Sequence, residues 1–333
     1  GDLHNLPAYD AFRQAVDHLE SVLAVAPKLV ACDMHPDYLS TRYARERGLP
    51  CIEVQHHHAH IASVLAEAGR RDRVIGVAFD GMGWGDDGGL WGGEFLACDL
   101  RASTRMAHIE PVPQPGGDAA AKRPPRMAYA YLRAAFGADA DAIAQERLPA
   151  FAATELTVVA QLLHRGVNCP PTSGMGRLFD AASALLGICD CNTYHAQAPM
   201  ELEACAADAL DEAGHYPARL RDSGPGPIVA VASDIVRHLV EDSGSGTPAA
   251  TCAARFHNSV AHLTLDICRR IRDNTRLQAV ALSGGVFANA FLVERLVPLL
   301  EQDGFEVLLN TAVPPGDGGI SLGQAAIAAA RAQ

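Results

Sequence analysis

The run Gln55-His56-His57-His58-Ala59-His60 is the part of the sequence best suited to chemistry. It follows a short apolar segment typical of a buried strand and leads into the apolar residues 61–65, so we expect a helix to begin near residue 56. In such a helix His56 and His60 lie one turn apart, with Cβ atoms about 5–6 Å apart, and both imidazoles can reach one metal ion. An exposed histidine cluster is the alternative, but the buried-looking flanks favour a metal site.

Two imidazoles leave a metal ion short of ligands, so carboxylates are expected from elsewhere in the chain. A zinc peptidase would need Glu directly after the first His of the pair, and His57 stands there instead. Asp80 and Asp317 are the candidates, because each is expected at the end of a strand in a glycine loop with little side-chain bulk. Asp80 would be a ligand or hold a bound water; aspartates in such loops can also be plain turn formers. Two His and two Asp favour iron(II), zinc or manganese.

Glycine-rich turns are a second signal, because glycine lets backbone N–H groups approach a phosphate closely. Residues 80–89 join two expected strands, residues 283–286 follow a strand and open a helix, and residues 173–176 precede a helix that carries Arg177 and Asp180. Each turn alone could be an ordinary hairpin or cap, but together they predict nucleotide binding. The sequence has no Walker A motif and no G-x-G-x-x-G after a strand, which disfavours P-loop and Rossmann chemistry.

Other polar segments carry weaker signals. Residues 33–38 form a polar cluster after the first expected strand, which we interpret mainly as helix capping. The nine cysteines are scattered without a CxxC pair, so buried reduced thiols are favoured over a zinc site or a disulfide framework. The sequence also lacks a G-x-S-x-G nucleophile elbow.

The elements that must position these residues change character along the chain. Residues 8–25 and 39–47 have helical periodicity and alternate with the strand-like runs 28–32 and 51–55, which is typical of a parallel α/β sheet. From residue 74, three strand-like runs separated by Gly/Asp-rich turns predict an antiparallel meander.

The rest of the chain is expected to be mainly α-helical before strands return. A Pro/Gly loop is predicted over residues 111–125, with Ala-rich helices to about residue 214. Later strands and helices are expected at 228–231, 279–282, 287–300, 306–309 and 320–330. By analogy, a meander followed by this alternation is typical of the ribonuclease-H-like lobes of actin-like and sugar-kinase-like ATPases. The predicted fold class is therefore α/β with two such lobes.

Composition narrows the functional classes. The chain has 333 residues, of which 49% are apolar and 20% charged, which indicates a globular protein of two domains or one two-lobed body. Its net charge of −12 makes nucleic acid a poor default partner. No apolar stretch approaches the roughly 18 residues of a membrane helix, and no signal peptide is visible. We expect a cytoplasmic protein.

Five motifs resemble the C-terminal domain of the carbamoyltransferases that mature nickel–iron hydrogenases. They are ACDMHPDYLSTRYA (31–44), VQHHHAHIASVLAE (54–67), VAFDGMGWGDDGGLWGGEF (77–95), GRLFDAASALLG (176–187) and ALSGGVFANAFL (281–292). The resemblance runs from residue 1 to about residue 330. This domain is similar to the tRNA threonylcarbamoyl transferases and to an antibiotic O-carbamoyltransferase, all two-lobed members of the actin-like ATPase superfamily.

The resemblance implies a lobe organisation. Residues 1–72 would form lobe I, joined by the C-terminal helix within 313–333, and residues 73–312 would form the nucleotide-binding lobe II. Lobe I is expected to lack its opening strands, since the sequence begins just before a helix.

The resemblance also implies a reaction. In that family carbamoyl phosphate and ATP give carbamoyl-adenylate, and the carbamoyl group then passes to the C-terminal cysteine of a partner maturation protein. His56, His60, Asp80 and Asp317 would be the metal ligands, with the first three catalytic, and Asp180 and Glu201 would hold the ribose. The other nucleotide-binding residues would be Gly81, Gly83, Gly174, Gly176, Gly284, Gly285 and Asn289.

The sequence departs from the family pattern in several places. Relatives carry acylphosphatase, zinc-finger and adenylate-forming modules upstream, so we expect transfer rather than synthesis of carbamoyl-adenylate by this chain alone. His195 replaces a usual Glu, and Pro124-Pro125 replaces a more usual Pro-Trp. The alternative functions are tRNA threonylcarbamoyl transfer and a non-catalytic nucleotide-binding interaction domain.

Overall fold

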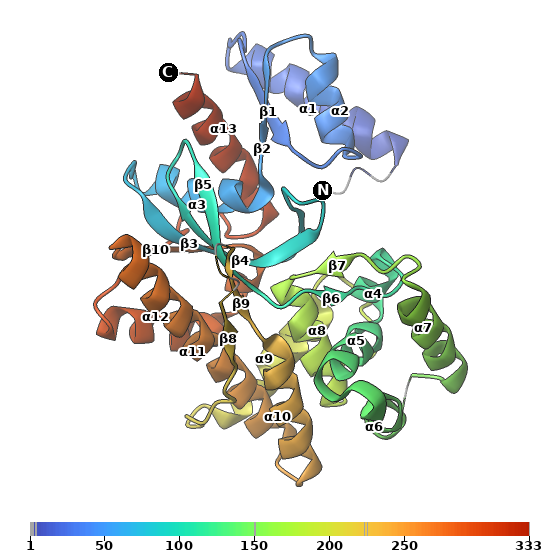
Figure 1. Cartoon of the computed structure of the whole chain (residues 1–333). Coiled ribbons are helices and arrows are strands. Elements are labelled where there is room, and N and C mark those ends of the chain that lie inside the picture. Colours follow the sequence, from blue (N-terminus) through green and yellow to red (C-terminus); the bar gives the residue numbers. More distant parts are fainter. Residues whose placement is uncertain (1–2, 4, 150, 223, 225, 333) are drawn as a thin grey trace.

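Two β-sheets of unequal size organise the chain in the computed structural model, which describes residues 3, 5–149, 151–222, 224 and 226–332 (Figure 1). In the smaller sheet, β1 (Val30–Asp33) pairs in parallel with β2 (Cys51–Val54). Helix α1 (Leu6–Val22) precedes β1, and α2 (Leu39–Glu46) connects the two strands. The alternation expected for this part of the chain is confirmed.

The larger sheet has the strand order β11-β10-β3-β4-β5-β9-β8. Its centre is the predicted antiparallel meander of β3 (Val74–Trp84), β4 (Leu90–Cys98) and β5 (Ser103–Ile109). β10 (Ala279–Ser283) pairs in parallel with both β3 and β11 (Glu306–Leu309). On the opposite side, β9 (Ile228–Ala230) runs parallel to β5 and pairs with β8 (Leu220–Arg221).

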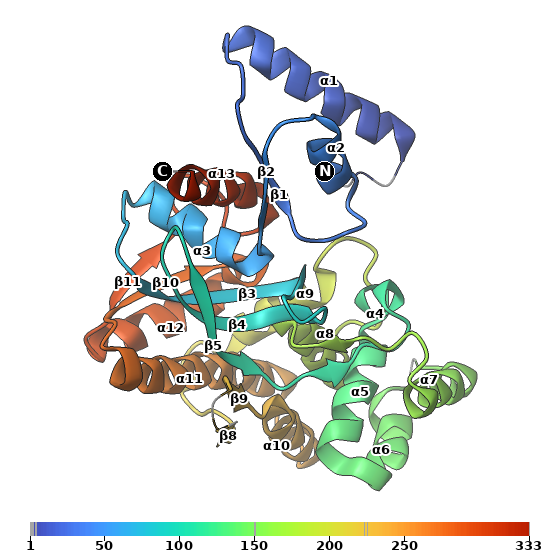
Figure 2. The same cartoon turned by 45° about the horizontal axis from the view of Figure 1, so that its top comes forward.

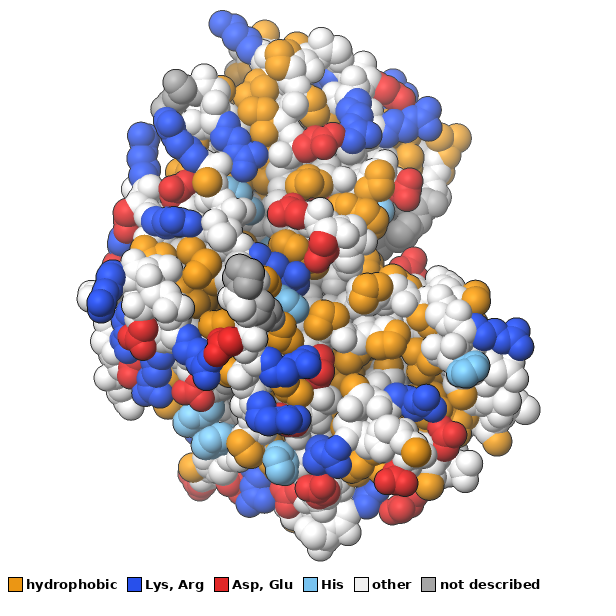
Figure 3. All heavy atoms as spheres, viewed as in Figure 1, with side chains coloured by type: hydrophobic (Ala, Val, Ile, Leu, Met, Phe, Trp, Pro, Cys, Tyr) orange, Lys and Arg blue, Asp and Glu red, His pale blue; other side chains and the backbone are white. Residues whose placement is uncertain are grey.

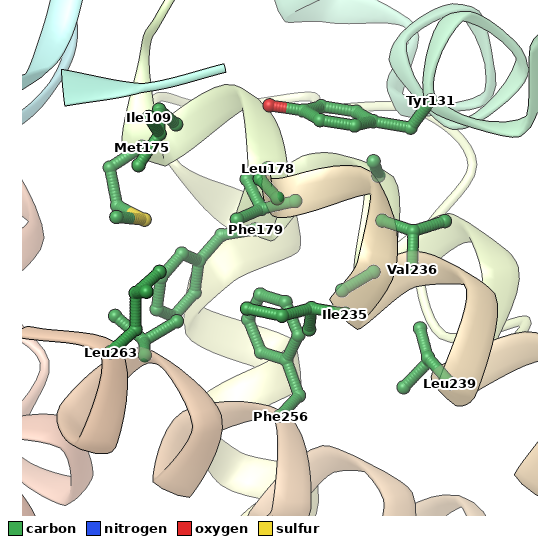
Figure 4. Close-up of a cluster of buried hydrophobic side chains, with 14 of the residues drawn as sticks. Ile109, Tyr131, Met175, Leu178, Phe179, Ile235, Val236, Leu239, Phe256 and Leu263 are labelled. Atoms are coloured by element: carbon green, nitrogen blue, oxygen red, sulfur yellow. The ribbon is translucent and has the colours of Figure 1, made fainter. Parts of the chain in front are cut away.

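One large apolar core joins the larger sheet to the helices that pack on it. Within it, Phe179 and Phe256 meet edge to face with ring centroids 4.9 Å apart, next to Ile235 (Figure 4). The helices between β5 and β11 are α4 (Asp118–Lys122), α5 (Pro124–Phe136), α6 (Ala140–Arg147), α7 (Ala153–Arg165), α8 (Met175–Leu185), α9 (Gln197–Ala206), α10 (Ala232–Gly244), α11 (Ala249–Thr275) and α12 (Ala290–Gln302).

Two segments differ from the sequence-based expectation. Residues 111–125 are not only a loop: they include β6 (Val112–Pro113), which pairs with β7 (Pro171–Thr172), then α4 and the start of α5. Helix α12 begins at Ala290 rather than at residue 287, because a 3₁₀ turn comes first and the Asn289 side chain then caps the helix.

Helix α3 (His56–Glu67) lies between the two sheets and is buried from His56 through Leu65. One side packs Ile61, Val64 and Leu65 against the larger sheet. Ala59 and Ala62 on another side meet the smaller sheet and α13 (Ile320–Arg331), which lies beside α3 in both views (Figures 1 and 2). The sequence that starts with the histidines therefore lies at the junction of both sheets.

No helix in the described part of the chain is long and apolar enough to span a bilayer.

Candidate metal centre

The histidine pair lies on the first turn of α3, as its spacing predicts. The helix starts there because Gln55 caps it: the Gln55 side-chain oxygen accepts a hydrogen bond of 2.9 Å from the backbone N–H of His58. The imidazole rings of His56 and His60 have centroids 4.9 Å apart, and both side chains are buried. Nε2 of His56 and both ring nitrogens of His60 have no hydrogen-bond partner among the described residues.

The structure brings Asp80 and Asp317 to this pair. One ligand atom from each of the four side chains lies within 4.8 Å of all the others. His56 Nε2 is 3.4 Å from Asp80 Oδ2 and 3.6 Å from Asp317 Oδ1, and the matching distances from His60 Nε2 are 3.8 and 3.7 Å. A tetrahedral site with bonds of about 2.0–2.2 Å spaces its ligand atoms by roughly 3.4 Å. The donor set, its spacing and the unpartnered buried nitrogens all fit one divalent metal ion.

The two aspartates are not at strand ends, and that part of the expectation is wrong. Asp80 lies inside β3, at an irregularity where pairing with β4 shifts between Phe79 and Gly83. Such a bulge leaves residues out of the ladder and redirects a side chain. Asp317 opens a 3₁₀ turn directly ahead of α13, well after β11 has ended.

The cluster is electrostatically coupled. Burial lowers the pKa of His56, but the neighbouring carboxylates of Asp317, Asp33 and Asp80 outweigh it and raise this pKa well above its ordinary value. Burial raises the pKa of Asp80, but His56 and His60 outweigh it and hold this pKa well below its usual range. Only the Asp317 side chain is largely exposed among the four, at 76%, so it marks the side from which solvent and an ion reach the cluster.

Sequence reasoning missed Asp33. Its Oδ2 lies 2.8 Å from Nδ1 of His56, and both side chains are buried. A carboxylate on the second ring nitrogen fixes the orientation of a ligating histidine and directs its Nε2 lone pair to the metal. The sequence shows only that Asp33 follows a strand-like run; the contact arises because β1 and β2 pair in parallel, which places Asp33 beside Val54, and Val54 lies two residues before His56.

Glycines surround Asp80 because no side chain fits there. A Cβ on Gly285 would lie 3.0 Å from Asp80 Oδ1, and one on Gly284, which has φ +108°, would lie 2.2 Å from the carbonyl oxygen of Phe79. A Cβ on Gly83 would come within 2.6 Å of the His56 ring. At the start of α8, Gly174 and Gly176 pack in the same way against the backbone of Gly81.

The other predicted nucleotide residues have contacts of their own. Buried Asp180 lies 2.9 Å from the Arg177 guanidinium, and its pKa is raised by burial. Glu201 accepts a hydrogen bond of 2.8 Å from Gln197. Asn289 caps α12 and lies 3.0 Å from Nε2 of His257. The role of these three residues in nucleotide binding stays a prediction.

Comparison with known proteins gives one consistent result. Residues 1–67 match the family described as "HypF Kae1-like domain", and residues 76–324 match "Carbamoyltransferase, Kae1-like Domain, second subdomain". Carbamoyltransferase HypF2 of Cupriavidus necator is 40% identical over 100% of this chain, and carbamoyltransferase HypF of a Synechocystis species is 36% identical over 97%. A crystal structure of full-length HypF in the phosphate- and nucleotide-bound form superposes with a TM-score of 0.92 and 39% identity over 98% of the chain.

These relatives are longer. The chain spans 43% of each of the two curated relatives and 42% of the crystallised protein. The likeness in fold confirms the predicted two-lobed α/β class.

Proposed function

The chain belongs to the HypF carbamoyltransferase family, in which it matches the Kae1-like domain, and from that premise we propose that it catalyses a carbamoyl transfer in the maturation of nickel–iron hydrogenases. The donor is carbamoyl-adenylate, made from carbamoyl phosphate and ATP. The acceptor is the C-terminal cysteine of a partner maturation protein. The chemistry is substitution at an activated carbonyl carbon.

In the proposed step, one bond to the carbamoyl carbon forms and one breaks. The cysteine thiol loses its proton to solvent, and its sulfur forms a bond with the carbamoyl carbon. The bond from that carbon to the phosphate oxygen of the adenylate breaks, and AMP leaves with the electron pair. No side chain of this chain needs to act as the nucleophile. Its buried thiols are poorly suited to that role, since burial raises the pKa of Cys98 to about 12.

Each predicted site residue has a task in this scheme. A divalent metal held by His56, His60, Asp80 and Asp317 would supply Lewis-acid polarisation of the carbonyl or orientation of the phosphate. Backbone N–H groups of Gly81 and Gly83, at and after the irregularity in β3, would donate to phosphate oxygens, where negative charge develops. Asp180 and Glu201 would accept from the ribose hydroxyls. The adenine would lie over Gly284 and Gly285, with Asn289, Gly174 and Gly176 around the nucleotide.

The observation that carries the proposal is the cluster of His56, His60, Asp80 and Asp317, with unpartnered imidazole nitrogens and one exposed carboxylate. It lies where backbone from several glycine turns meets Asp80. Metal ligands next to bare backbone are what a site for an activated acyl phosphate requires.

The test is a transfer assay with this chain, carbamoyl-adenylate and the cysteine-tailed partner, read as a carbamoyl mass increment on the partner. We expect the increment to need both the terminal cysteine of the partner and an intact histidine pair, so that the double variant His56→Ala/His60→Ala is inactive and metal-poor. His58→Gln is the matched control, because His58 lies on the same turn but hydrogen-bonds the Asp99 carbonyl instead. Transfer that survives loss of the terminal cysteine would contradict the proposal. Nucleotide binding without any transfer would support the interaction-domain alternative.

A further inference from the structure

Glu94 is a fully buried carboxylate in the middle of β4. Arg105 on β5 binds it in bidentate fashion, with Nε 2.6 Å from Oε2 and Nη2 3.0 Å from Oε1. A buried ion pair of this kind contributes little net stability, because the cost of removing both charges from water offsets their attraction. Its presence in a core strand therefore calls for a role other than stability.

A third partner shows where that role lies. The hydroxyl of Ser173 donates to Glu94, and Arg105 Nη2 is 3.3 Å from the same hydroxyl oxygen. Ser173 is buried and directly precedes Gly174, the cap residue of α8. The ion pair thus holds the turn at which α8 begins.

This turn lies directly on the backbone around Asp80. A Cβ on Gly93 would lie 2.6 Å from the carbonyl oxygen of Ser173, and a Cβ on Gly174 would lie 2.3 Å from that of Gly81. A Cβ on Gly92 would lie 2.6 Å from the carbonyl oxygen of Asp80. With no side chains between these segments, a shift of the Ser173 turn is transmitted to Asp80 and Gly81.

The guanidinium of Arg105 also holds the β3–β4 hairpin. It lies 3.9 Å above the ring of Trp91 and 3.4 Å from Oδ2 of Asp87. Trp91 Nε1 donates to Oδ1 of Asp87 at 2.9 Å. The indole packs so closely on Gly85 that a Cβ there would lie 2.2 Å from Trp91 Nε1. One guanidinium therefore contacts both glycine turns.

We propose that Glu94 and Arg105 are positioning residues that fix the 85–89 hairpin and the 173–176 turn relative to Asp80. Neither residue needs to touch substrate. The consequence for ligand affinity rests on the proposed function, in which these turns surround the nucleotide. The claim that one ion pair orders both turns does not depend on the proposed function.

Ser173→Ala is the most specific test, because it removes the hydrogen bond between the turn and Glu94 while Glu94 and Arg105 stay paired. The variant loses a hydrogen bond to a charged group that holds this turn, so we expect amide hydrogen exchange in residues 174–177 to rise about 10-fold. We expect the Kd for ATP to rise by a similar factor, with metal stoichiometry and the thermal midpoint nearly unchanged. Thr104→Ala is the control, since this exposed β5 hydroxyl contacts Arg73 instead.

Glu94→Gln is the second variant, and it should increase exchange in both turns at once because Arg105 loses its buried partner. Unchanged exchange in either variant overturns the proposal. Faster exchange with an unaltered ATP affinity overturns the claim that the ion pair supports nucleotide binding. A parallel decrease in metal content, ATP affinity and thermal midpoint in Ser173→Ala shows a general structural role instead. If the wild-type chain binds no nucleotide, the proposed function fails, while the exchange data still decide whether the ion pair orders the turns.

Discussion

At the scale of single residues, Asp33 orients one of the two candidate histidine ligands. Spacing brings His56 and His60 together, but the 2.8 Å contact from Asp33 to Nδ1 of His56 selects the ring orientation. We predict that Asp33→Asn lowers metal affinity by about 10- to 100-fold, because a neutral amide holds the imidazole more weakly. Chelator competition measures this, with the exposed Asp37→Asn as control. Equal affinities in Asp33→Asn and the wild type would show that Asp33 only caps the turn.

At the scale of residues, the sequence alone was enough to predict which side chains come together where this depends on local spacing. The i, i+4 histidines and the two aspartates with glycine neighbours could be singled out because each pattern is recognisable within a few residues of chain. Asp33 and Glu94 could not be identified in the same way. Each acts through a partner on another strand, His56 for one and Arg105 for the other, and sheet pairing alone brings those partners close.

Asp180 gives a residue-scale prediction about the nucleotide. If its carboxylate accepts from the ribose hydroxyls, Asp180→Asn replaces one of the two acceptor oxygens by an NH2 donor and removes the charge, at a cost of roughly 1–3 kcal/mol, or about 5- to 150-fold in ATP affinity. Calorimetric titration measures it, with Asp190→Asn as a charge-matched control. An affinity within error of the wild type, in a folded variant, would place the ribose elsewhere.

At the scale of elements, the contact of α13 with α3 depends on Gly323. A Cβ there would lie 1.9 Å from the carbonyl oxygen of Ala59, so the helices must separate to admit it. Alanine favours an isolated helix by about 1 kcal/mol over glycine, yet we expect Gly323→Ala to destabilise the protein by about 1–3 kcal/mol through overpacking. Metal affinity should fall too, because Asp317 directly precedes α13. Denaturant unfolding tests this against Ser321→Ala, on the exposed side of the same helix; a stabilised Gly323→Ala would refute the packing argument.

His257 gives the junction of α11 and α12 a pH dependence. Burial lowers its pKa to about 4, and Nε2 lies 3.0 Å from the Asn289 amide that caps α12. Between pH 6.5 and 4 the unfolded chain binds a proton at this histidine, whereas the folded chain does not. The contribution of neutral His257 to the free energy of unfolding is therefore fully present above pH 6.5 and decreases as the pH is lowered. The loss approaches roughly 3 kcal/mol near pH 4. We expect the free energy of unfolding to differ less between pH 7 and pH 4.5 in His257→Gln than in the wild type. The same pH dependence in the variant and the wild type would contradict this prediction.

Elements were predictable where the pattern is local. β11 and the meander follow from apolar runs between turns, and both appear as expected. The two-residue strands β6 and β7 were not predictable, because each is defined by pairing across nearly 60 residues rather than by its own sequence.

At the scale of the whole molecule, the ligands of the candidate metal centre come from separate parts of the chain. His56 and His60 lie on α3, Asp80 on β3 and Asp317 ahead of α13. Under the proposed division into lobe I (1–72 with 313–333) and lobe II (73–312), Asp80 is the ligand that lobe II supplies. In the space-filling view a recess separates the part that holds α1 and α2 from the part that holds α4 to α7 (Figure 3). Under the proposed function, the tail of the partner would enter the site through this recess.

The net charge of the molecule bears on the choice between a protein acceptor and tRNA. The net charge is −12, and on the face in Figure 3 the Lys and Arg side chains are interspersed with Asp and Glu. Binding to a phosphate backbone gains from counterion release and is strongest at low salt, whereas this surface repels such a polyanion on average. We therefore expect a large excess of tRNA, even at low ionic strength, to leave carbamoyl transfer to the cysteine-tailed partner unchanged. A competition assay that follows label on both acceptors measures this. Preferential labelling of tRNA, or salt-sensitive inhibition by it, would mean that a local basic surface outweighs the net charge and that the acceptor is a nucleic acid.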